Sequence, residues 1–544
     1  MHTPTRTPPK PTCIIGKCPS IDLIARSRVS RNVTYCCYDS LPIPFGLVNI
    51  LGNRNSSYIP ILRLPNWRVS RPVLIMASQP EAPAAEAPPT ANPPSTKQTV
   101  DPWNVSGEVG EDGKVKAIDY KKLVEEFGTK LIDQAILDRF ERVTGHKPHR
   151  FLRRQIVFSQ RDLEVILNRH EKREPFFLYT GRGPSSDSMH IGHTQIFDFC
   201  KWLQDVFDVP LVIMLTDDEK FLFSEKRTVE EVIGYARENC RDIIAIGFDP
   251  DKTFIFSDYE YMGGAFYRNV TRFSKLVTYN VAKSVFGFNE SSNIGKIHFA
   301  SIQGSTSFAT SFPHIFGDNE KETAKIPCLI PCAIDQDPYF RLTRDCATRL
   351  KYAKPSLIHS RFLDALQGPG SKMSASIDSS AIFLKDTPNQ IKNKINKYAF
   401  SGGQETAEQQ RELGGNPDVD VAYQYLQFFM EDDEELAKLG QDYREGKLLT
   451  GELKAVCIKH LQEYVSGFQE RRAKATDDVV KQFMSVRPLN WKGNPRVERI
   501  VPVSETQAEG AGDGKLSKNQ LKKLEKEKQI AAKKAAKAAE KTAA

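Results

Sequence analysis

The chain has 544 residues, of which 40% are apolar and 26% charged, and its formal net charge is +8 at pH 7. This composition is typical of a globular protein with room for two to four domains. No apolar run approaches the roughly 20 residues of a membrane-spanning helix, which argues against a membrane protein. The charge is uneven, because residues 1–75 carry +8 and residues 515–544 carry +7, which leaves −7 for the residues between them. Basic contacts with nucleic acid must therefore come from the ends or from local patches.

Residues 1–75 are rich in Arg, Ser and Pro and contain only two acidic residues. They resemble an organelle transit peptide more than a secretory signal, because they lack a clean apolar stretch before a small-residue cleavage site. Two alternatives remain open: a dispensable disordered extension, or an upstream start codon with Met76 as the working start. Residues 76–100 are dominated by Pro and Ala and are expected to form a linker that cannot bury a core.

Four of the ten cysteines lie within the first 75 residues, and the other six are scattered through apolar surroundings. Cys328 and Cys332 are four residues apart, but neither has a second Cys or His pair at zinc spacing. We therefore expect these six cysteines to be buried, reduced thiols. We also expect no protein-bound metal ion.

Order is expected to begin near Asp101. Residues 101–175 are predicted to form a mostly helical appended segment, because apolar residues recur at helical spacing over 119–145. The Arg-Asp-Leu stretch at 161–163 indicates the start of a further helix.

Residues 176–385 have a different pattern, which predicts an α/β fold. Short apolar runs at 176–180 and 209–218 indicate strands, and a Gly-containing loop and an amphipathic helix separate them. Such a unit is by default right-handed and belongs to a parallel sheet. Further strands are predicted at 243–248, 253–258 and 328–335. We therefore expect a Rossmann-type, doubly wound parallel sheet.

Residues 386–487 are predicted to form a helical domain, because long segments have apolar residues at helical spacing. Residues 488–514 are expected to be a linker. Residues 515–544 are rich in Lys, Ala and Glu, and Ser517 with Gln520 makes a capping box. A solvated helix and an electrostatic tether for RNA both fit this tail.

Residues 190–193, His-Ile-Gly-His, follow the first predicted strand and open the next helix. A helix N-terminus attracts anions, and two imidazoles there can donate hydrogen bonds to phosphate oxygens. Gly192 leaves room for a flat ring near the backbone. The preceding loop adds a guanidinium, bare backbone and hydroxyls, from Arg182, Gly183, Ser185 and Ser186. The alternative is that His190 and His193 only cap the helix.

Lys372 lies in a second motif, KMSAS at 372–376, which follows Gly-Pro-Gly-Ser. A lysine among small hydroxyl residues on a Gly-rich loop suits a clamp on a leaving phosphate group. Alone, this stretch is typical of a solvated loop. The histidine motif earlier in the chain favours the phosphate role.

HIGH followed by KMSAS in one α/β chain resembles the class I aminoacyl-tRNA synthetases. Further blocks in the same order resemble the eukaryotic cytosolic tryptophanyl-tRNA synthetases: DPW, FLRRQIVFSQRD, YTGRGPSS, KWLQDVFDVPLVI, TDDEK, TFIFSD, IPCAIDQDPYFRLTRD, KPSLIHS and AFSGG. The similarity covers about residues 101–487. It implies that 386–487 binds the anticodon of tRNA(Trp), with Gln404 and Glu405 as weak candidates for contacts.

The resemblance also implies the reaction and its residues. The carboxylate of L-tryptophan attacks the α-phosphate of Mg·ATP, and tryptophan then passes from the adenylate to tRNA. The implied catalytic residues are His190, His193 and Lys372. The implied ATP-binding residues are Arg182, Gly183, Ser185, Ser186, Gly192, Asp335, Met373, Ser374 and Ser376. The implied tryptophan-binding residues are Tyr179 at the indole N–H, Met214 beside it, and Glu219, Gln303 and Gln336 at the ammonium and carboxylate.

Three departures from the family pattern surround the expected amino-acid pocket. Met214 stands where the family usually has Gln, QGSTSF at 303–308 replaces QAAPSF, and RDCATR at 344–349 replaces RDVAPR. Methionine is a poor acceptor, so we expect Tyr179 to recognise the indole alone. A lost acceptor costs about 1–3 kcal/mol of selectivity.

The resemblance further implies a homodimer and a cytoplasmic enzyme, with organellar targeting if residues 1–75 are a transit peptide. Three alternative functions remain open, the first of which has the same fold and the same motifs. They are a tyrosyl-tRNA synthetase, a small-molecule nucleotidylyltransferase, and a catalytically weakened RNA-binding paralogue. The GRGPSS and AIDQDPYFR blocks argue against the first, and KMSAS with a helical domain argues against the second. Intact His190, His193 and Lys372 argue against the third.

Overall fold

The computed structural model describes residues 97–110, 116–370, 373–374 and 377–490. The predictions for the transit peptide, most of the Pro/Ala linker and the Lys-rich tail therefore lie outside the described residues. So do those for Lys372 and Ser376. The described chain begins with a two-stranded antiparallel hairpin, β1 (Thr99–Val100) and β2 (Val105–Ser106).

A seven-stranded sheet organises the described chain, in the order β3-β4-β9-β8-β5-β6-β7. Five neighbouring strands, β9, β8, β5, β6 and β7, run parallel, whereas β4 and β3 are antiparallel additions at one edge. The strands are β3 (Lys130–Leu131), β4 (Val157–Arg161), β5 (Phe177–Arg182), β6 (Leu211–Leu215), β7 (Thr253–Ser257), β8 (Cys328–Ala333) and β9 (Ser356–Ser360). The parallel order reverses direction between β5 and β8, as in a doubly wound sheet.

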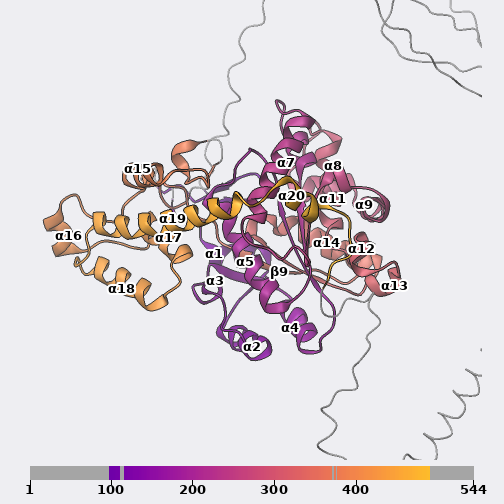
Figure 1. The fold of residues 1–544 in the computed structure, drawn as a ribbon, viewed down its shortest axis with the longest axis horizontal. Helices are drawn as coiled ribbons and strands as arrows, with labels where there is room; N and C mark the ends of the chain where they lie inside the picture. The colour runs from indigo at the N-terminus through magenta and orange to yellow at the C-terminus, as the bar shows by residue number, and fades with distance from the viewer. Residues whose placement is uncertain (1–96, 111–115, 371–372, 375–376, 491–544) are drawn as a thin grey trace, which may run out of the picture. The chain divides into compact units, whose positions relative to one another are not determined.

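The strands bury both of their faces, which explains why they appear in the sequence as continuous apolar runs. Leu178 belongs to the core cluster on one face, which includes residues of helices α5 (Ile191–Phe207) and α7 (Val229–Ile244). Its neighbours Phe177 and Tyr179 belong to the cluster on the other face, which includes residues of α9 (Gly264–Leu276), α11 (Ile294–Ser305) and α14 (Asp337–Leu350). Figure 1 shows helices on both faces of the sheet. The predicted α/β class is therefore confirmed.

Most predicted elements are present, but one strand is wrong. Residues 243–248 are the end of helix α7 (Val229–Ile244) and the turn after it. Ala236, Cys240 and Ile243 are buried at helical spacing, so the apolar run continues a helix face. A short apolar run before a glycine does not distinguish a strand from a buried helix end.

The helices before the sheet's first parallel strand are α1 (Tyr120–Phe127), α2 (Gln134–Thr144), α3 (Arg150–Arg153) and α4 (Leu163–Glu171). Those within the sheet region are α5 (Ile191–Phe207), α6 (Asp217–Leu222), α7, α8 (Asp258–Tyr261), α9 (Gly264–Leu276), α10 (Tyr279–Phe286), α11 (Ile294–Ser305), α12 (Pro313–Phe316), α13 (Glu320–Thr323) and α14 (Asp337–Leu350). Three 3-10 turns are η1 (Ala309–Ser311), η2 (Ile334–Gln336) and η3 (Asp378–Ser380). Helix α5 begins with the residue after His190, as the motif predicts.

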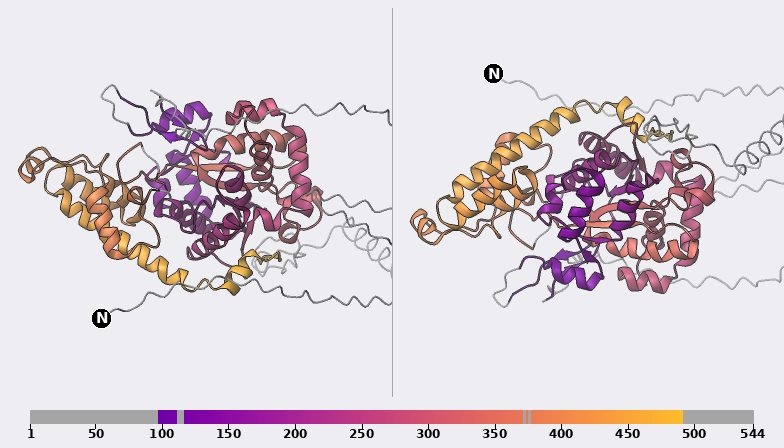
Figure 2. Two further views of the ribbon diagram at one scale, coloured as in Figure 1. Left: turned by 90° about the horizontal axis from the view of Figure 1, so that it is seen from above. Right: turned by 90° about the horizontal axis from the view of Figure 1, so that it is seen from below.

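The C-terminal part is helical, with α15 (Pro388–Tyr398), α16 (Ala407–Leu413), α17 (Val421–Phe429), α18 (Asp433–Arg444), α19 (Thr450–Arg472) and α20 (Asp477–Met484). The long helix α19 packs against α17 and α18 and contacts α7 with its C-terminal end. Both views in Figure 2 show it as the long orange-to-yellow helix that extends from the orange helical part toward the sheet region. One hydrophobic cluster contains residues from the sheet, from α5 and from α17 and α19. The helical part and the sheet therefore share a core.

The six cysteines of the described chain, Cys200, Cys240, Cys328, Cys332, Cys346 and Cys457, are buried and free. This confirms their prediction as reduced thiols. Among the described residues, no helix combines the length and the apolar character needed to cross a bilayer.

Candidate active site

A cavity of about 290 Å³ opens where the parallel strand order reverses, beyond the carboxyl ends of β5 and β8. Doubly wound sheets bind ligands at this position. Its lining includes most of the predicted site residues: Tyr179, Arg182, Gly183, His190, Gly192, His193, Glu219, Gln303, Asp335, Gln336 and Met373. The fold therefore brings together two sets of residues that the sequence assigned to different ligands.

The imidazole rings of the two histidines of HIGH stack on each other at the start of α5. Their ring centroids are 3.5 Å apart with an interplanar angle of 22°. His190 is the N-cap of the helix, and its backbone N–H donates to Nδ1 of His193 at 3.3 Å. Both rings also line the cavity. Capping the helix and facing a ligand are thus compatible roles.

The chain just after KMSAS pairs with HIGH through its backbone, and Met373 within the motif makes one close contact. The Ile191 N–H donates to the Ile382 carbonyl at 3.0 Å, and the Leu384 N–H donates to the Met189 carbonyl at 3.1 Å. A Cβ added to Gly192 would lie 3.0 Å from Sδ of Met373. Two motifs separated by about 180 residues in sequence are therefore adjacent in space.

The helical part holds the chain on both sides of KMSAS. Before the motif, the Phe400 N–H donates to the Leu366 carbonyl at 2.8 Å. After it, Nζ of the buried Lys394 donates to Asp378 at 2.8 Å and to Asp386 at 2.9 Å. The backbone N–H of Ser374 donates to the hydroxyl of Ser380 at 3.2 Å. The position of the loop ends therefore depends on the helical part.

Arg182 is half-buried at the end of β5, with its Nη2 atom enclosed, and is linked to HIGH. Its Nε donates to the side-chain oxygen of Asn239 at 3.0 Å, and Nη1 lies 3.0 Å from Nε2 of His193. Its Nη2 has no hydrogen-bond partner among the described residues. Burial lowers the pKa of the guanidinium to about 10, so it remains charged at neutral pH. A buried, charged donor in the cavity wall suits an anionic ligand.

The loop from Ser185 to Ser188 lies behind the cavity wall. Ser185 and Ser186 are not among the lining residues; the Ser186 hydroxyl instead donates to the Ser188 carbonyl at 2.9 Å. The amide of Asn239 donates to the Ser186 carbonyl at 2.7 Å. Sequence reasoning missed Asn239, because a lone Asn inside an amphipathic helix carries no signal. It holds both Arg182 and the loop.

The other end of the cavity has aromatic and amide groups. Tyr179 is fully buried, and its ring meets Phe340 edge-on with centroids 5.8 Å apart. Nε2 of Gln303 donates to the side-chain oxygen of Gln336 at 3.3 Å. Glu219 accepts from Thr216 at 2.9 Å and pairs with Lys220. This arrangement can take a flat apolar ring that carries an ammonium and a carboxylate.

Met214 lies behind Tyr179 and is not among the cavity-lining residues. Its Sδ accepts from the Tyr179 hydroxyl at 3.4 Å and from the Thr306 hydroxyl at 3.1 Å. The Tyr179 hydroxyl also lies 3.4 Å from the Gln303 carbonyl. Thr306 belongs to QGSTSF, where the family pattern has Pro. Two of the three departures are therefore in contact.

A cluster of buried acidic groups includes the two residues directly before Glu219 in the chain. Oxygens of Asp217, Asp218 and Asp258 lie within 4.8 Å of one another. Burial raises the pKa of Asp218 to about 6 and that of Asp258 well above its usual range. Bound protons can therefore offset the charge of this cluster. Asp335 is also buried, in η2 at the cavity wall.

Pro102 of the β1–β2 hairpin also lines the cavity, so the DPW block reaches the site. Trp103 stacks on Phe223 with ring centroids 5.7 Å apart. The weak tRNA candidates, Gln404 and Glu405, are exposed and lie away from the cavity lining. The amide of Gln404 donates to the Gly414 carbonyl at 2.9 Å.

The profile of the family described as tRNA synthetases class I (W and Y) matches residues 171–466. The chain thus belongs to that class of enzymes. It is 61% identical to the cytoplasmic tryptophan–tRNA ligase of Schizosaccharomyces pombe over 396 residues, 73% of this chain and 99% of the relative. It is 58% identical to that of Saccharomyces cerevisiae over 413 residues, 76% of this chain and 94% of the relative.

A crystal structure of a tryptophanyl-tRNA synthetase from Encephalitozoon cuniculi, bound to tryptophan, has the same fold. It matches with a TM-score of 0.62 and 44% sequence identity, and the match covers 68% of this chain and 98% of that one. Within the class I synthetases, the chain belongs to the tryptophan–tRNA ligase family.

Proposed function

We propose that this chain activates L-tryptophan with ATP and transfers it to tRNA(Trp). One observation carries the proposal: a single cavity at the switch point of the sheet has a phosphate-type wall and an amino-acid-type wall. Arg182, His190 and His193 form the first, and Tyr179, Glu219 and Gln336 belong to the second. Adenylate formation requires both ligands side by side.

The roles follow from the chemistry of each wall. Arg182 and the two histidines donate to the phosphates of Mg·ATP, and the open backbone at Gly183 and Gly192 admits the nucleotide. Asp335 accepts from the ribose hydroxyls. Lys372, with Ser374 and Ser376, neutralises the leaving pyrophosphate. Its positive charge and its place in a Gly-rich stretch of the sequence suit this role.

On the amino-acid wall, Tyr179 stands at the indole and Glu219 accepts from the α-ammonium. Gln303 and Gln336 donate to the carboxylate and hold it toward the α-phosphate. Oxygen attack there forms the mixed anhydride and expels pyrophosphate. Such reactions depend on positioning and charge neutralisation more than on covalent help from the protein.

Further proposals concern partners. A homodimer is consistent with two large apolar side chains, Tyr267 on α9 and Ile294 at the start of α11, which are 52% and 83% exposed. Light scattering after size exclusion should give twice the chain mass.

The Lys-rich residues 515–544 add electrostatic RNA binding, so removing them should weaken tRNA binding most at low salt.

We also propose that the chain acts in the cytoplasm and that its longest form reaches an organelle through residues 1–75. A fluorescent fusion of residues 1–80 should then localise to an organelle. A diffuse signal would contradict targeting, and translation from Met76 would explain it.

Pyrophosphate exchange by the full chain tests the central proposal. Exchange should require tryptophan, and tyrosine should support it at least about a hundredfold less well. Exchange with tyrosine alone, or with no amino acid, would overturn the assignment. Charging of tRNA(Trp) transcripts then tests the second step.

A further inference from the structure

The N–H of Met189, the residue before His190, is held by a carboxylate outside the cavity. Asp242 of α7 is buried, and its Oδ2 accepts from the Met189 N–H at 3.1 Å. Its Oδ1 accepts from Nε of Arg472 at 2.5 Å. One carboxylate therefore joins the backbone at HIGH to the last residue of α19.

The Met189 carbonyl is held from the other side by a segment that α19 also contacts. The Leu384 N–H donates to this carbonyl at 3.1 Å. Nε2 of Gln469 in turn donates to the Leu384 carbonyl at 2.9 Å. Gln469 and Arg472 are three residues apart and so lie on one face of the helix.

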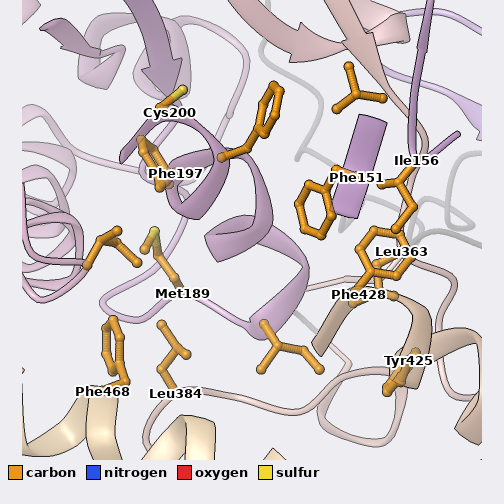
Figure 3. Packing of buried hydrophobic residues seen from close by; sticks show 14 of the residues in the cluster. Phe151, Ile156, Met189, Phe197, Cys200, Leu363, Leu384, Tyr425, Phe428 and Phe468 are labelled. Atoms are coloured by element: carbon orange, nitrogen blue, oxygen red, sulfur yellow. The ribbon is translucent and has the colours of Figure 1, made fainter. Parts of the chain in front are cut away.

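Side-chain packing supports the same connection. Met189, Leu384 and Phe468 belong to one buried cluster. Figure 3 shows Met189 between Phe197 of α5 on one side and Leu384 with Phe468 of α19 on the other. Both peptide groups and the side chain of Met189 therefore depend on where α19 lies.

The far end of α19 contacts the AFSGG segment, residues 399–403, which directly precedes the anticodon candidates Gln404 and Glu405. The Thr450 hydroxyl lies 3.4 Å from that of Ser401, and Nζ of Lys454 donates to the Ala399 carbonyl at 2.8 Å. A continuous helix of 23 residues joins this end to Arg472. At 1.5 Å per residue it spans about 33 Å.

We propose that Arg472 and Gln469 are positioning residues for His190, acting through Asp242 and Leu384. Helix α19 thereby links the AFSGG segment to the phosphate-type wall of the cavity. The inference rests on the proposed function. A helix is stiff over this length, and the ion pair between the half-buried Arg472 and the buried Asp242 transmits a shift of one partner to the other. Displacing the end of α19 therefore displaces the start of α5.

The test is tryptophan-dependent pyrophosphate exchange by the full chain, with rates divided by active sites counted from the adenylate burst. Arg472→Gln should lower kcat/KM for ATP about tenfold and leave KM for tryptophan within twofold of wild type. Arg472→Lys, which keeps the charge, should recover part of the loss. The matched control is Arg471→Gln, which removes a 2.7 Å bond to the Ala245 carbonyl at the end of α7 without touching Asp242.

A double-mutant cycle distinguishes a positioning role of Arg472 through Asp242 from a general loss of activity. Asp242→Asn alone should reduce ATP use as Arg472→Gln does, and the double variant should be no worse than the poorer single variant. Gln469→Ala provides an independent variant if Arg472→Gln does not fold. Additive losses, a parallel rise in KM for tryptophan, or equal effects of Arg472→Gln and Arg471→Gln would overturn the inference. A wild-type chain without exchange would instead refute the proposed function.

Discussion

Gly192 of HIGH and Met373 of KMSAS lie in contact, so close that a methyl group on Gly192 would stand 3.0 Å from the methionine sulfur. The same methyl group would lie 3.1 Å from Nδ1 of His190. The contact between the motifs therefore depends on a missing side chain in the first turn of a helix. Helix propensity alone would favour alanine there.

We predict that Gly192→Ala lowers kcat/KM for ATP about tenfold or more, because Met373 and His190 must both move. KM for tryptophan should change little. Gly234→Ala is the control, since that glycine is exposed in α7 and a Cβ there meets nothing within 4 Å. Pyrophosphate exchange measures both variants. Equal activity of the two would contradict a steric role for Gly192.

Arg161 at the end of β4 forms two 2.7 Å bonds with the buried Asp337 at the start of α14. Burial opposes ionisation, but hydrogen bonds from Arg161 and His359 hold the pKa of Asp337 down at about 2. The carboxylate thus stabilises the fold above its unfolded pKa of about 3.9, and that stability is lost as the pH falls through about 2.

Arg161→Ala should therefore cost about 3–5 kcal/mol at pH 7, because it leaves a buried charge without its partner. Arg237→Ala removes an exposed pair with Glu260 and should cost no more than about 1 kcal/mol. Urea unfolding compares them. If Arg161→Ala lowers the free energy of unfolding as little as Arg237→Ala does, the Arg161–Asp337 pair contributes little to stability.

Met214 and Thr306 together replace the family's Gln and Pro, and they contact each other behind Tyr179. We predict that Met214→Gln increases the ratio of kcat/KM for tryptophan to that for tyrosine about tenfold, because an amide is a stronger partner for the Tyr179 hydroxyl. Met214→Leu keeps the volume and removes the sulfur acceptor, so it should not increase the ratio. An unchanged ratio in Met214→Gln would mean that this position does not tune selectivity.

Asp258 lies in the buried acidic cluster, where burial and Asp218 raise its pKa. A raised carboxyl pKa means that stability is present at low pH and is lost as the pH rises through the folded-state value. Asp258→Asn should therefore stabilise the chain at pH 8 and stabilise it less at pH 5.

Thermal unfolding at the two pH values measures this difference. Asp205→Asn, at an exposed pair with Lys201, should show no such pH dependence. An Asp258→Asn variant that is destabilised at pH 8 would indicate that the ionised cluster contributes to the fold.

Local sequence features were sufficient to predict the fold class, the family and the charged and polar residues that face the cavity from β5, HIGH and η2. Apolar runs marked β5, β6, β7 and β8, and HIGH marked the start of α5, because strand burial and helix capping are local requirements. It misassigned 243–248, where a buried helix end and a buried strand have the same composition.

Contacts between residues far apart in the chain became apparent only in the folded structure. The fold brought Met373 against Gly192, joined Met214 to Thr306, and attached α19 to HIGH through Asp242. It also left Ser185 and Ser186 outside the set of residues that line the cavity. These outcomes depend on packing between elements far apart in the chain, and a lone Asn239 or Asp242 inside a helix carries no sequence signal for such contacts.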